Sequence, residues 1–244
     1  MLSSSLPILL LMLSFLPSSS FPSSFPRSLS LLLRPLSSSS QLPSLPYTIG
    51  ITGPIASGKT TFSTSLSNLK NYTLLQADSL ITYPPNSTSY DLIVSEFGPQ
   101  IVGSDSLIDR KILGDIVFSS PPKMKILESI LWPEASLKIS TFLKATSNNV
   151  VLLEASPLHS AGWDIQFCDE VISVTAKESV RVGRLMARNG LTEEEARRRV
   201  EGQRGKIREG GTVIVNEGEG MEEEVEREGR RIDGIIKKIL EDMD

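Results

Sequence analysis

The sequence contains very little cysteine and histidine: its 244 residues include one of each, Cys168 and His159. A single cysteine cannot close a disulfide within the chain, which excludes a disulfide scaffold and indicates that the folded part works where thiols stay reduced. The 25 basic residues are outnumbered by 29 acidic ones, a net charge of -4. The chain therefore lacks the basic excess of a nucleic-acid-binding protein, and we expect no nucleic-acid partner. Any anionic ligand must meet a local basic cluster.

Acidic residues are absent from the beginning of the chain, where the first one is Asp78. Residues 1–46 consist almost entirely of Ser, Leu, Pro and Phe, and their only charges are Arg27 and Arg34. The apolar stretch from Leu6 to Leu16 has the length of a signal-peptide core and is shorter than the roughly 20 residues of a membrane-spanning helix. We therefore expect no stable membrane span in the mature protein.

The rest of this segment is rich in hydroxyl groups and weakly basic, as organellar transit peptides are. The composition predicts that residues 1–46 are a cleavable targeting segment, leading to a plastid by a signal-plus-transit route or to a mitochondrion. The alternative is a tail without an address function, which would leave the protein in the cytoplasm.

Residues 47–244 form one domain-sized unit in which strand and helix patterns alternate. Five short apolar runs have strand length, and most are followed by a helical pattern; they begin near residues 47, 72, 150, 170 and 212. Such alternation predicts an α/β fold with a parallel five-stranded sheet and helices on both faces. The long helical stretch from about 79 to 146 exceeds a simple crossover, so we expect it to form an inserted substrate-binding subdomain at the carboxyl edge of the sheet.

The strongest motif is GPIASGKT, residues 53–60, which fits the phosphate-loop pattern G-x-x-x-x-G-K-[ST] and lies between a strand and an amphipathic helix. In such a loop the glycines let the backbone wrap a phosphate, and the helix N-terminus adds a positive field. Lys59 would contact the outer phosphates and Thr60 would hold Mg²⁺. The motif predicts a nucleoside triphosphate ligand but does not name a reaction.

Asp78 ends the second predicted strand at the same sheet edge as the phosphate loop. It could accept a proton from a hydroxyl group, or it could cap the helix that follows, as aspartate often does. Its position leaves both readings open. A regulatory GTPase is excluded because the base-reading tetrapeptide Asn-Lys-x-Asp is absent.

Eight segments in order resemble the dephospho-coenzyme A kinase family, over essentially all of residues 47–244: IGITGPIASGKTT, LLQADSLI, YDLIVSEFGPQIV, LIDRKILGDIVFS, ILESILWP, EASPLHSAGW, RLMARNGLTEEEARRRVEGQ and VIVNEG. The middle of the chain, including Trp132-Pro133, looks similar to the kinase half of the animal bifunctional coenzyme A synthase. The nucleotidylyltransferase half is absent, because its H-x-G-H motif needs two histidines.

The resemblance implies ATP-dependent phosphorylation of the 3'-hydroxyl of dephospho-coenzyme A, with ATP and Mg²⁺ as cofactors. It implies that Asp78 is the general base, that Lys59 and Arg184 are catalytic, and that Thr60 binds the metal. The implied ATP-binding residues are Thr52, Gly53, Pro54, Ile55, Ala56, Ser57, Gly58, Lys59, Thr60, Thr61 and Arg188.

Arg184 and Arg188 match the arginines of the family's lid, placed here at about residues 184–210, and with Arg181 they fall on one helical face. The other reading is a solvated basic stripe beside apolar residues. Nine basic and four acidic residues lie between Arg181 and Arg208, which supplies the local basic cluster. Asp109 and Arg110 resemble substrate-binding positions, or they form a surface ion pair.

Two departures from the family pattern are Gln76, where an acid is common, and Ser160, where glutamate is usual. Both would fit a catalytically impaired regulatory homologue, whereas Lys59, Thr60, Asp78 and Arg184 argue for an enzyme. Another P-loop kinase for small molecules or nucleotides is the second alternative. The oligomeric state does not follow from the sequence.

Overall fold

A computed structural model describes residues 45–203 and 211–241. Residues 1–44, which make up nearly all of the predicted targeting segment, and residues 204–210 at the end of the predicted lid lie outside the described residues.

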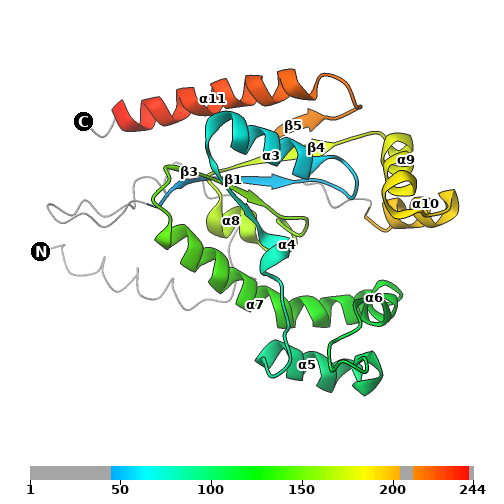
Figure 1. Cartoon of the computed structure of the whole chain (residues 1–244). Coiled ribbons are helices and arrows are strands. Elements are labelled where there is room, and N and C mark those ends of the chain that lie inside the picture. The colour runs from blue at the N-terminus through cyan, green and yellow to red at the C-terminus, as the bar shows by residue number, and fades with distance from the viewer. Residues whose placement is uncertain (1–44, 204–210, 242–244) are drawn as a thin grey trace, which may run out of the picture. The chain divides into compact units, whose positions relative to one another are not determined.

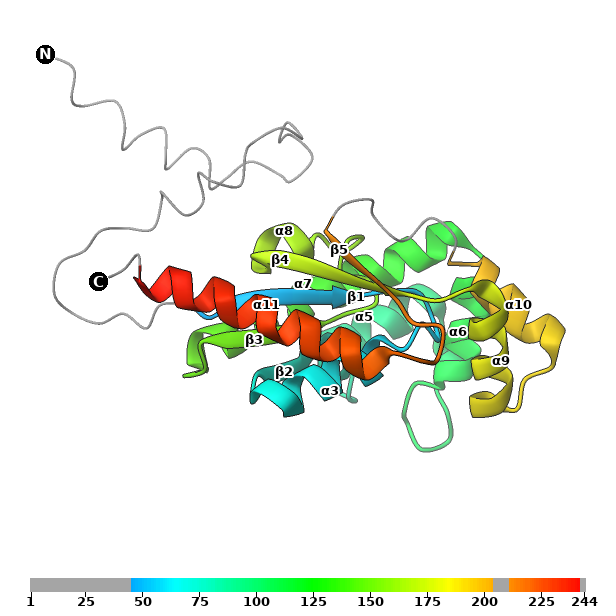
Figure 2. The same ribbon diagram turned by 90° about the horizontal axis from the view of Figure 1, so that it is seen from above.

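The centre of the fold is a five-stranded parallel sheet (Figure 1), and its strands lie in the order β2-β3-β1-β4-β5, as the view from above shows (Figure 2). The strands are β1 (Tyr47–Thr52), β2 (Thr73–Gln76), β3 (Val150–Glu154), β4 (Glu170–Thr175) and β5 (Thr212–Val215). This confirms the predicted sheet. Because β1 pairs with both β3 and β4, the loops that follow these three strands leave the same edge side by side.

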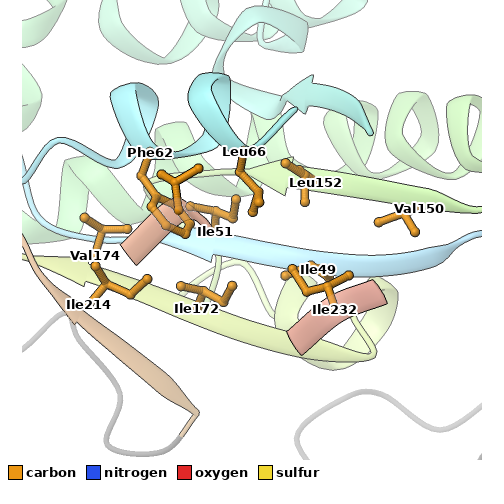
Figure 3. Close-up of a cluster of buried hydrophobic side chains, with 11 residues drawn as sticks. Ile49, Ile51, Phe62, Leu66, Val150, Leu152, Ile172, Val174, Ile214 and Ile232 are labelled. Carbon is orange, nitrogen blue, oxygen red and sulfur yellow. The ribbon is translucent and has the colours of Figure 1, made fainter. Parts of the chain in front are cut away.

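One face of the sheet is covered by α3 (Lys59–Lys70) and α11 (Met221–Glu241). Alternate strand residues such as Ile49, Ile51 and Ile172 point to this face and pack against Phe62 of α3 and Ile232 of α11 (Figure 3). These side chains are fully buried, so this cluster is the main core beneath the phosphate loop.

The opposite face is covered by the second half of α7 (Pro121–Ala145) and by α8 (Trp163–Phe167). Val151 and Leu153 of β3 pack there against Ile139 of α7 and Trp163 of α8. The sheet is therefore covered by helices on both faces, which explains why its strands are nearly continuous apolar runs (Figure 2).

The region between β2 and β3 contains α4 (Ala77–Leu80), α5 (Thr88–Phe97), the 3-10 helix η2 (Pro99–Ile101), α6 (Arg110–Phe118) and α7. Residues of α5, η2 and α6 form a separate apolar cluster with the first half of α7. Pro133 lies inside α7, between the half that packs on this cluster and the half that packs on the sheet. One continuous helix thus joins two cores.

A helix pair, α9 (Glu178–Asn189) and α10 (Glu193–Glu201), follows β4. Gly190 ends α9 in the left-handed conformation, and Thr192 begins α10 with a capping box to Glu195. Val182, Leu185, Ala196 and Val200 form a small core of their own, on which Ile55 and Ala56 of the phosphate loop pack. Of the helices within the described ranges, none is long and apolar enough to cross a membrane.

Candidate active site

The phosphate loop connects β1 to α3 and needs glycine at two positions. A Cβ atom on Gly53 would lie 2.1 Å from the carbonyl oxygen of Val174, and one on Gly58 would lie 2.0 Å from Nδ2 of Asn216. Gly58 also has a φ of 92°, in the left-handed region that favours glycine. The loop is therefore packed tightly between β4 and the chain after β5, and its amides at the N-terminus of α3 remain available for an anion.

Three side chains from outside the loop bind its backbone. Arg184 of α9 donates to the carbonyl oxygens of Ala56 and Ser57 at 3.2 and 3.1 Å. Asn216 Nδ2 donates to the Ser57 carbonyl at 2.9 Å, and Gln203 Oε1 accepts from the amide of Ile55 at 2.6 Å. The loop conformation is thus held from α9, from the end of α10 and from the end of β5.

A cavity of about 600 Å³ opens beside the loop. It is lined by residues 58–61, by Arg184 and Arg188 of α9, and by Asn216, Gly218 and Met221. Arg188 is exposed, and its Nε donates to Oδ1 of Asn189 at 3.0 Å. The structure therefore brings Lys59, Thr60 and both predicted lid arginines to one cavity of the size of a small-molecule site.

Glu154 is a candidate site residue that the sequence did not single out. It ends β3, is 6% exposed, and its carboxylate accepts hydrogen bonds from Thr60 Oγ1 at 2.5 Å, Ser63 Oγ at 2.7 Å and Gln76 Nε2 at 3.3 Å. Within residues 45–203 and 211–241, no ion pair of this buried carboxylate is found. A buried anion normally has a cationic partner.

Carboxylate and hydroxyl oxygens are the ligands that Mg²⁺ prefers, so Glu154 and Thr60 fit a magnesium ion next to the phosphate loop. The signal that could have found Glu154 is an acid at the carboxyl end of a buried strand. This signal points to the phosphate loop only once it is known that β3 lies beside β1.

Asp78 lies in the first turn of the short helix α4, whose N-cap is Gln76. Asp78 is exposed, and its Oδ2 accepts a hydrogen bond from Ser156 at 3.3 Å. Ser156 follows Glu154 by two residues, so Asp78 stands near the carboxyl end of β3 with a side chain open to a ligand. The alternative role considered for Asp78 was that of a helix cap, but the N-cap position of α4 is held by Gln76.

The remaining predicted site residues lie at different places. Thr52 is buried at the end of β1, directly before the loop. Asp109 caps α6 by accepting from the amides of Lys111 and Ile112, and the Arg110 guanidinium lies 5.4 Å from the ring centre of Tyr83. Asp109 and Arg110 therefore do not form an ion pair with each other. Their role in binding a substrate stays a prediction.

His159 Nδ1 lies 2.9 Å from the buried carboxylate of Asp164, in the loop after β3. The pair joins the loop to α8.

Comparison with known proteins identifies the family. The family model for dephospho-CoA kinase matches residues 47–222. A dephospho-CoA kinase of Symbiobacterium thermophilum is 35% identical over 178 residues, or 70% of this chain and 74% of the relative. The chain belongs to the dephospho-CoA kinase family.

Two further comparisons agree with this membership. A dephospho-CoA kinase domain-containing protein of Danio rerio is 32% identical over 201 residues, 80% of this chain and 87% of the relative, which fits the expected likeness to an animal kinase domain. The solved structure of the dephospho-CoA kinase from Campylobacter jejuni matches with a TM-score of 0.54 and 25% identity, covering 76% of this chain and 96% of that one. The α/β P-loop kinase fold and the family predicted from the sequence are thereby confirmed.

Members of the dephospho-CoA kinase family are ATP-dependent P-loop kinases that use Mg²⁺ with ATP, and this confirms the expected cofactors. The membership also removes the alternative of a P-loop kinase from another family. The catalytic roles of Asp78, Lys59 and Arg184, and the ATP contacts of residues 52–61 and Arg188, stay predictions.

Proposed function

We propose that this chain transfers the terminal phosphoryl group of ATP to the 3'-hydroxyl of dephospho-CoA, giving CoA and ADP, the final step of CoA biosynthesis. The observation that carries the proposal is the match to the dephospho-CoA kinase family over residues 47–222, a range that contains the phosphate loop, Glu154 and Asp78.

The phosphate loop binds the triphosphate of ATP. Lys59 and the free amides at the start of α3 contact its phosphate oxygens, and the exposed guanidinium of Arg188 covers them from α9. Thr60 and Glu154 hold Mg²⁺, which supplies the positive charge that phosphoryl transfer needs. Both side chains already share a hydrogen bond at 2.5 Å, so little rearrangement is required.

Asp78 acts on the acceptor. The 3'-oxygen forms a bond to the terminal phosphorus while the bond from that phosphorus to the bridging oxygen breaks, ADP leaves, and the Asp78 carboxylate takes the hydroxyl proton. The Ser156 hydroxyl, which donates to Asp78 Oδ2 at 3.3 Å, orients the carboxylate.

The helices between β2 and β3 form the binding surface for the acceptor, and α9 with α10 forms the lid over the phosphates. Support for the first role is the separate apolar cluster of α5, η2 and α6, in which α5 and α6 pack on α7. In this proposal Asp109 and Arg110 belong to the acceptor-binding surface.

The test is an assay of the purified chain with ATP, Mg²⁺ and dephospho-CoA. We expect equal amounts of ADP and CoA, with the product identified by mass spectrometry as carrying one added phosphate. Lys59→Ala should lower turnover by about a hundredfold or more, because it removes a fixed charge from a transfer that depends on electrostatics. The control Lys237→Ala removes an exposed lysine that pairs with Glu241 on α11 and should leave turnover unchanged. ADP formation without CoA would overturn the proposal.

A further inference from the structure

The guanidinium of Arg184 is surrounded by carbonyl oxygens. Its Nη1 donates to the main-chain oxygens of Ala56 and Ser57, and its Nη2 donates to the main-chain oxygen and to Oδ1 of Asn216 at 3.3 and 3.0 Å. Both terminal nitrogens, which together carry four of the five N–H donors of an arginine, are therefore bound to neutral oxygens of the protein. An arginine held in this way has few donors left for a phosphate.

Asn216 completes the arrangement from a third element. It follows β5 and is 6% exposed, and its Oδ1 accepts from Arg184 and from the amide of Gly218 at 3.2 Å. Its Nδ2 donates to the same Ser57 carbonyl that Arg184 binds. The two side chains thus bind each other and share one oxygen of the phosphate loop.

The orientation of that oxygen decides where the next amide points. In a trans peptide the C=O and the following N–H lie on opposite sides of the bond, so holding the Ser57 oxygen outside the loop directs the Gly58 N–H into the loop. The amide of Ser57 itself bonds to the Pro54 oxygen at 3.1 Å and closes the turn.

The loop conformation that Arg184 and Asn216 hold is one that the chain resists on its own. Ala56 has a φ of 61°, in the left-handed region, which is energetically unfavourable for a residue with a side chain. Hydrogen bonds between a charged guanidinium and carbonyl oxygens are among the stronger ones in proteins, and two of them fall on Ala56 and Ser57. They are strong enough to offset that cost.

We propose that Arg184 and Asn216 are positioning residues, which together set the phosphate-binding conformation of the loop, and that Arg188 is the arginine of α9 left to contact the transferred phosphoryl group. The proposal rests on the phosphate-binding role of the loop and refines the proposed function. It revises the role expected for Arg184, from neutralising the phosphoryl group directly to acting on it through the loop.

The test measures the dissociation constant of ADP by calorimetry, in the full chain and without dephospho-CoA. We expect Arg184→Met and Asn216→Ala each to raise it by about tenfold. Arg184→Met removes the charge-assisted hydrogen bonds to the loop, and Asn216→Ala removes both the amide that binds the Ser57 oxygen and the oxygen that accepts from Arg184. In the double variant the dissociation constant of ADP should lie within about twofold of that of the more affected single variant, because both changes break the same arrangement. Fully multiplicative effects, or normal ADP binding by Arg184→Met with lowered turnover, would overturn the proposal.

A conservative variant separates position from charge. Arg184→Lys keeps the positive charge but has one nitrogen, which cannot bind oxygens of the loop and of Asn216 in the forked geometry. It should bind ADP as weakly as Arg184→Met; recovery of wild-type affinity would show that charge alone is needed and would refute the positioning role. Asn216→Asp, which keeps the acceptor for Arg184 and loses the donor to Ser57, replaces Asn216→Ala if the latter fails to fold.

Two controls complete the design. Arg230→Met removes an exposed arginine of α11 that pairs with Glu226, and ADP affinity should not change. Arg188→Met combined with Asn216→Ala should show multiplicative effects on turnover, because these two residues act separately. A wild-type chain that binds ADP but does not phosphorylate dephospho-CoA would contradict the proposed function and still leave the ADP experiment valid.

Discussion

Asp78 is the residue whose role the sequence left most open, and the structure makes the test clear. In Asp78→Asn the hydrogen-bonding reach toward Ser156 is retained and the proton acceptor is lost. Because Gln76, and not Asp78, holds the N-cap position of α4, the melting temperature should change little. Loss of a general base should lower turnover by about a hundred- to ten-thousandfold. Steady-state kinetics and a melting curve on the same sample check this.

The control for Asp78 is Ser156→Ala, which removes only the hydroxyl that orients the carboxylate and should have a much smaller effect on turnover. If Asp78→Asn kept wild-type turnover, Asp78 would not be the base. The neighbouring Gln76 offers an amide, which donates to Glu154, so it cannot take over the proton.

Glu154 should determine the magnesium requirement. Glu154→Gln keeps an acceptor oxygen for one of the two hydroxyls, those of Thr60 and Ser63, and removes the negative charge beside the phosphate loop. We expect the Mg²⁺ concentration for half-maximal rate to rise by at least about tenfold. Titration of the rate with MgCl₂ measures it, and Glu226→Gln on the exposed part of α11 serves as the matched control. An unchanged titration would exclude Glu154 as a ligand.

The elements of the fold were largely predictable because their signals are local. Short apolar runs marked all five strands, and the glycines and Lys59 marked the turn into α3. The roles of Glu154 and Arg184 were not predictable in the same way. Glu154 depends on the pairing of β3 with β1, whose partner residues, such as Ile51 and Glu154, lie 103 positions apart. Arg184 binds main-chain oxygens, which carry no residue signature.

Besides its apolar contacts, α11 is joined to the sheet by one arginine. Arg231 binds both oxygens of Glu170 at 2.9 Å and Glu228 at 2.6 Å, and these hydrogen bonds, that to Glu170 first, hold the pKa of its guanidinium above the usual range against burial. Glu228 is only 3% exposed. Removing Arg231 leaves this buried carboxylate without its main partner.

Arg231→Ala should therefore lower the free energy of unfolding by about 3–5 kcal/mol. Urea unfolding of the two proteins gives the difference. Changing Glu228 to Gln in the same chain should restore part of the loss, since the buried charge, which Arg227 approaches only to 3.6 Å, is then gone. A loss below about 1 kcal/mol for Arg231→Ala would mean that α11 is held by its apolar face alone.

In the whole chain, every described element of the kinase lies after residue 46. β1 begins at Tyr47, whose amide donates to the Asn149 oxygen, so within the described residues β1 is bonded into the sheet from its first residue. A chain of residues 47–244 should fold and should phosphorylate dephospho-CoA at the rate of the full chain. The turnover and the melting temperature of the two chains are measured and should be equal. A lower value of either in the shorter chain would mean that residues 1–46 contribute to the kinase.

Residues 1–46 should instead direct the protein to an organelle. The segment has no acidic residue, and its two charges are Arg27 and Arg34, a composition that import receptors accept. Fused to a fluorescent protein, it should move the fluorescence into plastids or mitochondria and should be cleaved, which a shift in gel mobility measures. Replacing both arginines with glutamate reverses the charge without changing the apolar stretch, and import should fall strongly. Diffuse fluorescence from the unchanged segment would mean that it carries no address.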